Sequence, residues 1–95
     1  MKQNQKSQTK HDSAVRKVAG GYKSQGWKVK ADIPGYPTPR TIFGRQPDVI
    51  ATKGAKTKIV EIETAKSYAK DIAQRNAFKR FAALNNKRSF RTKVV

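Results

Sequence analysis

The chain of 95 residues contains no cysteine and a single histidine, His11. Disulfide bonds, thiolate metal sites and cysteine nucleophiles are therefore excluded, and so is a zinc site built from several histidines. The chain also lacks an apolar stretch long enough to cross a bilayer, and no apolar segment follows its basic N-terminus. We expect neither a transmembrane helix nor a signal peptide, and hence a cytoplasmic protein.

Acidic residues are also scarce. Six Asp and Glu stand against 22 Lys and Arg, which gives a formal net charge of +16, and three of the six lie close together as Asp48, Glu61 and Glu63. The positive excess favours nucleic acid over a membrane surface, because one Leu and one Trp provide little apolar surface for insertion. So small and self-repelling a domain is expected to gain stability from a polyanion, from a homodimer, or from both.

Residues 1–8 are polar and without periodicity, which predicts a flexible basic tail, and residues 9–95 form a single domain. Apolar residues on one face predict a helix over residues 9–25, namely Ala14, Val15, Val18, Ala19 and Tyr22. Gly26 stands where a left-handed residue would end that helix. Residues 27–33 alternate apolar and polar and predict a half-buried strand, with Trp27 in the core.

Residues 34–46 contain three of the four prolines and are predicted to form a loop. Its length for so small a domain favours a functional role. Arg40 and Arg45 are expected to contact a nucleic-acid backbone, and Tyr36 and Phe43 are candidates for stacking.

Two strands are predicted over residues 47–52 and 57–64, joined by a turn centred on Gly54-Ala55. In an antiparallel hairpin with that turn, Asp48 lies opposite Glu61. Because side chains alternate along a strand, Glu61 and Glu63 share one face. The sequence therefore predicts that the three carboxylates converge on one patch.

A second helix is predicted over residues 66–85, followed by a strand over residues 89–95. Its expected apolar face is Ala69, Ala73, Ala77, Phe81 and Leu84, with Ile72 and Phe78 at the edges. Its cations, including Lys66, Lys70 and Arg75, are expected to be exposed. The order α-β-β-β-α-β predicts an α/β fold with a small mixed sheet flanked by helices.

Three carboxylates at one end of a hairpin suit Mg²⁺, which prefers oxygen ligands and retains water and substrate phosphate in its coordination sphere; Mn²⁺ is the expected substitute. A metal beside phosphates implies phosphodiester hydrolysis.

Pro47-Asp48, followed on the next strand by Glu61-Ile62-Glu63, resembles the PD-(D/E)XK nuclease superfamily, which includes restriction endonucleases and Holliday-junction resolvases. The resemblance covers about residues 9–95 and implies the same α-β-β-β-α-β core and an endonuclease acting on duplex or branched DNA. It implies that Asp48 and Glu61 are metal ligands. Glu63 stands where the family usually has lysine, as in its ExE variants.

The departure at Glu63 leaves the catalytic cation open. In some members of the superfamily the catalytic cation stands at a neighbouring position. By that resemblance Lys66 or Lys70, or less favourably Lys58, takes the role here. Lys66 and Lys70 are also expected to bind DNA, and a homodimer would suit paired cuts.

Other interpretations stay open. The acidic residues could form a solvated face paired with Lys and Arg, and His11 could be a partly buried histidine or approach the metal with Asp12. Asp12 could instead complement the helix dipole. Asp32 could be a fourth ligand or a turn residue.

Asp71 is expected to have a structural role, and Gln74 to lie on the surface rather than near the site. Phe81 is expected in the core. The alternative function is a non-catalytic nucleic-acid-binding protein on the same fold, and a weaker one is a ribosomal-type RNA-binding protein. Whether the chain is a truncated or a minimal viral or archaeal version is also open.

Overall fold

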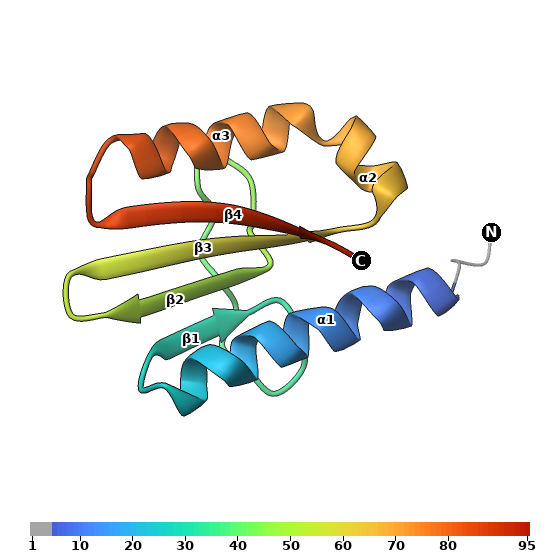
Figure 1. Cartoon of the computed structure of the whole chain (residues 1–95), viewed down its shortest axis with the longest axis horizontal. Coiled ribbons are helices and arrows are strands. Elements are labelled where there is room, and N and C mark those ends of the chain that lie inside the picture. The colour runs from blue at the N-terminus through green and yellow to red at the C-terminus, as the bar shows by residue number, and fades with distance from the viewer. Residues whose placement is uncertain (1–4) are drawn as a thin grey trace.

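A four-stranded mixed sheet lies between helices in this small α/β domain (Figure 1). The computed structural model describes residues 5–95, with side chains from residue 9 onward. The elements in chain order are α1 (Gln5–Ser24), β1 (Lys28–Ala31), β2 (Val49–Lys53), β3 (Lys56–Glu63), α2 (Ala65–Lys70), α3 (Ile72–Ala83) and β4 (Arg88–Val94). The predicted element order is confirmed, except that two helices stand where one was expected.

The strands follow the order β1-β2-β3-β4, antiparallel as far as β3, while β4 runs parallel to β3. The parallel pair requires a crossover, which α2 and α3 provide. In the β2–β3 hairpin Lys53 pairs with Lys56 and Val49 with Val60, so the predicted register is correct. Gly54 has a φ of 60°, the left-handed value that such a two-residue turn needs at its first central position.

Alternation along the strands gives the sheet two buried faces. On the face covered by α1, Val15 and Ala19 pack with Val49, Val60 and Ile62. On the face covered by α3, the buried residues are Ile42, Ile50, Ile59, Phe78 and Phe81. Glu61 and Glu63 alternate with Val60 and Ile62, so they point to the α3 face.

Helix α1 confirms its predicted apolar face and ends as expected. Val15 and Ala19 are fully buried and Tyr22 packs against the core. Gly26 has a φ of 89°, its N–H donates to the Lys23 carbonyl, and the Trp27 N–H donates to the Tyr22 carbonyl. These two bonds form a Schellman motif that closes the helix.

Helix α1 begins at Gln5, earlier than expected, and the first four residues of the predicted tail lie outside the described residues. Asp12 is therefore not in the first turn, where it would complement the helix dipole. Within residues 5–95, no helix is long and apolar enough to cross a membrane.

The predicted helix over residues 66–85 is interrupted at Asp71, and its expected apolar face is correct only at Ala77 and Phe81, with Phe78 buried beside them. Ala69 and Ala73 are exposed, as are Ile72 at 55% and Leu84 at 67%. The buried residues of α3 are Arg75, Ala77, Phe78 and Phe81. The helix is rotated relative to the predicted face because it packs polar side chains onto the two glutamates of β3.

Candidate functional site

Asp48 and Glu61 face each other across the end of the β2–β3 hairpin, as predicted. The Asp48 backbone N–H donates to Glu61 Oε1 (2.9 Å), and Asp48 Oδ2 accepts from the Ile62 N–H (2.8 Å). These reciprocal bonds lie where the strand pairing ends and hold the two carboxylates in place. Glu61 is 3% exposed, whereas 14% of the Asp48 side chain reaches solvent.

Helix α1 brings His11 to Asp48. His11 Nε2 lies 3.4 Å from Asp48 Oδ2, and its Nδ1 lies 3.2 Å from Asp12 Oδ1. The hydrogen bond with Asp48 raises the His11 pKa to about 9, assisted by the charges of Asp48 and Asp12 and opposed by burial. His11 is therefore an imidazolium ion at neutral pH, both partly buried and in contact with the candidate site, which joins the two interpretations left open by the sequence.

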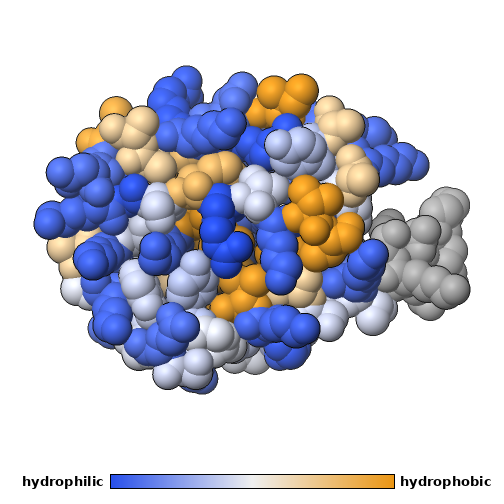
Figure 2. Space-filling model, in the orientation of Figure 1, coloured by the Kyte–Doolittle hydropathy of each residue, from blue (hydrophilic) through white to orange (hydrophobic). Residues whose placement is uncertain are grey.

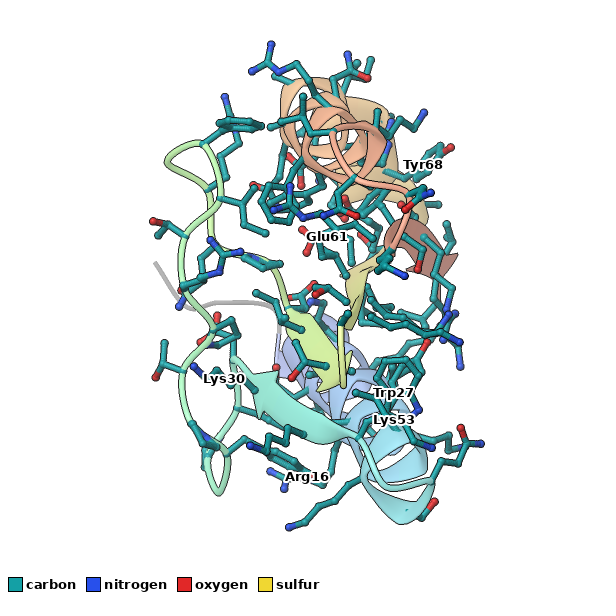
Figure 3. The ribbon with its side chains drawn as sticks, turned by 90° about the vertical axis from the view of Figure 1, so that its left-hand side faces the viewer. Arg16, Trp27, Lys30, Lys53, Glu61 and Tyr68 are labelled. Atoms are coloured by element: carbon teal, nitrogen blue, oxygen red, sulfur yellow. The ribbon has the colours of Figure 1, made fainter. Side chains whose placement is uncertain are left out.

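Glu61 sits between the sheet and α3 (Figure 3). Burial and then the charge of Asp48 raise its pKa to about 8, although hydrogen bonds from the Asp48 backbone and from Gln74 oppose the shift. Gln74 Nε2 donates to Glu61 Oε2, so the expectation that Gln74 lies on the surface is wrong. At neutral pH Glu61 holds a proton.

Glu63 shares the face of Glu61 but contacts a different set of residues. Ser67 Oγ donates to its Oε1 (2.7 Å), and Arg75 Nη1 lies 3.8 Å from its Oε2. Ser67 is fixed by a reciprocal capping box with Thr64 at the start of α2. Burial raises the Glu63 pKa, and the nearby Asp71 adds to the shift. Glu63 is thus tied to the α2–α3 junction.

Arg75, like Gln74, lies at the site against expectation. It was expected to be exposed, yet it is 8% exposed, its Nη1 donates to the Tyr68 carbonyl (2.5 Å), and its guanidinium stacks 3.7 Å from the Tyr68 ring centroid. The available signal was its spacing from Phe78, one helical turn further on. An interior glutamate on β3 is what makes burial of this cation favourable.

The cations expected at the site lie apart from this network. Lys66 and Lys70 are exposed on α2. Arg40 lies over the Phe81 ring at 5.1 Å, and Arg45 forms an isolated bridge with Ile42 in the loop.

The two stacking candidates differ in the structure. Phe43 is 49% exposed and lies beside Phe81 and Arg80, whereas Tyr36 packs half-buried on the α1-side core. Trp27 and Phe81 were expected in the core; Phe81 is buried, but Trp27 is half-buried beneath Lys53 and Lys58.

The described residues contain no group of three or more His, Asp or Glu arranged to hold a metal ion. The structure brings together Asp48 and Glu61, with His11 and Gln74 as their neighbours, and separates Glu63 into the Ser67 and Arg75 network. Asp32 is exposed, and its backbone N–H donates to the Asp48 carbonyl (2.9 Å).

No protein-family model and no curated protein matches the chain.

Proposed function

We propose that the chain is a metal-dependent endonuclease of the PD-(D/E)XK type that hydrolyses phosphodiester bonds in DNA. The observation that carries the proposal is the Asp48–Glu61 pair, two carboxylates held face to face at the end of a hairpin in a chain of net charge +16. The order α-β-β-β-α-β, with β4 parallel to β3, supports the specific nuclease core.

Asp48 and Glu61 are the proposed ligands of Mg²⁺ or Mn²⁺, two carboxylates that meet without a third acidic group beside them among the described residues. Asp48 and Glu61 supply carboxylate oxygens, and these cations commonly need only one or two such groups from protein. Glu61 carries a proton at neutral pH because it is buried beside Asp48, and a cation can take the place of that proton. Glu63 stays a proposed third ligand, since its Oε2 is buried with no hydrogen-bond partner among the described residues.

A bound Mg²⁺ would activate water and neutralise charge on the phosphate. The chain's own residues prepare the site: His11 holds Asp48, and Gln74 with the Asp48 N–H orients Glu61. Lys66 is proposed as the catalytic cation, since it is exposed and directly precedes Ser67, whose hydroxyl donates to Glu63. Lys70, Arg40 and Arg45 are proposed to hold DNA, whose phosphates they would neutralise.

The proposed enzyme acts as a homodimer inside the cell, with duplex or branched DNA as substrate. Two copies related by a twofold axis would place two sites for paired cuts. Exposed apolar side chains on α2 and α3, such as Tyr68 at 44% and Ile72, offer a surface for such an interface.

The test is incubation with Mg²⁺ or Mn²⁺ and a panel of duplex, single-stranded, flap and four-way DNA. We expect Asp48→Asn to lower cleavage about 100-fold or more, because it removes the more accessible of the two paired carboxyl groups. Asp32→Asn is the matched control, since Asp32 is exposed and offers only its backbone to Asp48. Cleavage by Asp48→Asn at the wild-type rate would overturn the assignment, and symmetrical paired cuts on the four-way junction would support the dimer.

The second candidate is a non-catalytic nucleic-acid-binding protein on the same fold. It is favoured by the burial of Glu61 and Glu63, at 3% and 2% exposed, and by the glutamate in the position of the family lysine. This candidate predicts salt-dependent binding without a metal requirement and without products in the same panel.

A further inference from the structure

Strand β4 exposes one of its faces beside α1. It forms an edge of the sheet, and its Phe90 packs on Phe78 of α3 at 5.7 Å between ring centroids. Because side chains alternate, Ser89, Arg91 and Lys93 point to the opposite face. On that face α1 packs against β1, β2 and β3, which leaves the side chains of β4 beside the helix rather than beneath it.

Two hollows border strand β4. One of about 370 Å³ lies between α1 and β4, and its basic residues are Lys17, Arg91 and Lys93. Another of about 390 Å³ lies at the β2–β3 turn and the start of β4, and its basic residues are Lys56, Lys58, Lys87 and Arg88. No carboxylate lines either hollow. Figure 2 shows strongly hydrophilic side chains in the middle of this view, interspersed with less polar and apolar ones.

An aromatic pair joins the two hollows. Tyr22 lines the first hollow and meets the Trp27 ring edge to face, at 5.7 Å between centroids. Lys58 lines the second hollow, lies 5.6 Å from the Trp27 centroid and pairs across the strands with Ser89. Both hollows are lined in part by β4, and their residues Lys17, Tyr22, Lys58, Ser89, Arg91 and Lys93 are here called the β4 groove.

The geometry points to the β4 groove as a binding site for one extended strand of nucleic acid. Residues two apart on a strand are about 6.7 Å apart, which is roughly the separation of successive phosphates in an extended polynucleotide. Ser89, Arg91 and Lys93 therefore present a hydroxyl and two cations in register with three phosphates. The half-buried ring of Tyr22 lines the first hollow and offers surface on which a base can stack, and the unpaired bases of a single strand are free to do so, whereas those of a duplex are already stacked and paired.

This site is separate from the proposed catalytic residues. Glu61 and Gln74 lie on the α3 face, whereas the β4 groove lies on the α1 face. Figure 3 shows Trp27 and Lys53 on the side of the sheet away from the loop of residues 34–46. Strand binding in the groove therefore does not depend on catalysis.

The test measures binding of a fluorescein-labelled oligothymidylate of about 20 nucleotides by anisotropy, in EDTA and about 100 mM salt. The groove variant is Arg91→Ser with Lys93→Ser. Its matched control is Lys28→Ser with Lys30→Ser, which removes the same charge from exposed positions on the other edge strand, β1. We expect the groove variant to bind about tenfold more weakly and to lose about 1.4 from the slope of log affinity against log salt, because two phosphate contacts disappear. The control should keep the wild-type slope.

Trp27 is the single tryptophan and lies against Tyr22 and Lys58 of the groove, so its emission reports on binding beside it. The oligonucleotide should quench its emission in the wild type, whereas a duplex of the same length should not. This readout keeps the proposal testable if the groove variant does not fold. Equal losses in both double variants, equal quenching by duplex, or displacement of the strand by oligoglutamate of matched charge would each overturn the proposal. Because no metal is present, these outcomes are independent of whether the chain cleaves DNA.

Discussion

At the scale of single residues, the site consists of titratable side chains that contact one another around Asp48. His11 and Glu61 both contact Asp48, and both have pKa values raised above their ordinary values. The sequence showed that Asp48 and Glu61 face each other, since strand register decides that. It could not show that Gln74 and Arg75 attach to the two glutamates, because helix packing decides which turn of α3 meets them.

These shifts predict that the metal-free protein loses stability as pH rises. Folded Glu61 keeps its proton up to about pH 8 against 4.5 in the unfolded chain, and folded His11 keeps its proton up to about pH 9 against 6.5. In both windows the folded state binds more protons than the unfolded state, so the free energy of unfolding falls with pH. Urea titrations from pH 4.5 to 9 measure this fall.

Two substitutions separate the contributions of Glu61 and His11 to this pH dependence of stability. Glu61→Gln should flatten the profile between pH 4.5 and 8, and His11→Asn should flatten it between pH 6.5 and 9. A free energy of unfolding that rises with pH in the wild type, or a pH profile that neither variant changes, would contradict the raised pKa values of Glu61 and His11.

At the scale of elements, local sequence patterns are sufficient to predict the C-terminal end and buried face of α1 and the register of the β2–β3 hairpin. They are not sufficient for α2 and α3. The capping glycine and the apolar face of α1 are both evident in the sequence. For residues 66–85, part of the predicted apolar face is exposed in the structure, namely Ala69, Ala73 and Leu84, because α3 places Gln74 and Arg75 against buried carboxylates. A polar or charged side chain is buried favourably only where a polar partner is buried beside it. No local sequence pattern shows where that partner will lie, because the partner comes from another segment of the chain.

Two glycine substitutions, one inside α1 and one just after its end, are predicted to change the stability of the protein in opposite directions. Gly26→Ala should destabilise the protein by about 1 kcal/mol or more, because a φ of 89° is unfavourable for a residue with a Cβ. Gly20→Ala should stabilise it by up to about 1 kcal/mol, because Gly20 is inside the helix and its added Cβ meets no atom within 4 Å. Thermal or urea unfolding measures both, and equal effects of the same sign would contradict the assignment of the helix end.

At the scale of the whole molecule, the positive charge is distributed over both faces of the sheet while the acidic pair is confined to one end. Lys53 and Lys58 lie by Trp27 on the α1 face, and Arg40 and Arg80 lie by the aromatic rings on the α3 face. Repulsion among charges of one sign opposes folding of so small a domain.

We therefore predict that the protein becomes more stable as salt is added. Raising sodium chloride from about 20 to about 300 mM shortens the screening length and should increase the Tm by several degrees. Scanning calorimetry with an uncharged osmolyte at equal osmolality as the control measures the effect. A Tm that stays constant or falls would mean that ion pairs, rather than repulsion, dominate the folded state.

The sequence alone determined the element order, the hairpin register, the face shared by Glu61 and Glu63, and a charge suited to a polyanion. These follow from strand alternation, a two-residue turn and composition, which are properties of neighbouring residues. The tertiary structure decided that Glu61 is buried against Gln74, that Glu63 belongs to Ser67 and Arg75, and that β4 and α1 enclose a basic groove. Those outcomes depend on how the crossover seats α3 and β4 against the sheet, and that placement is set by packing between segments far apart in the chain.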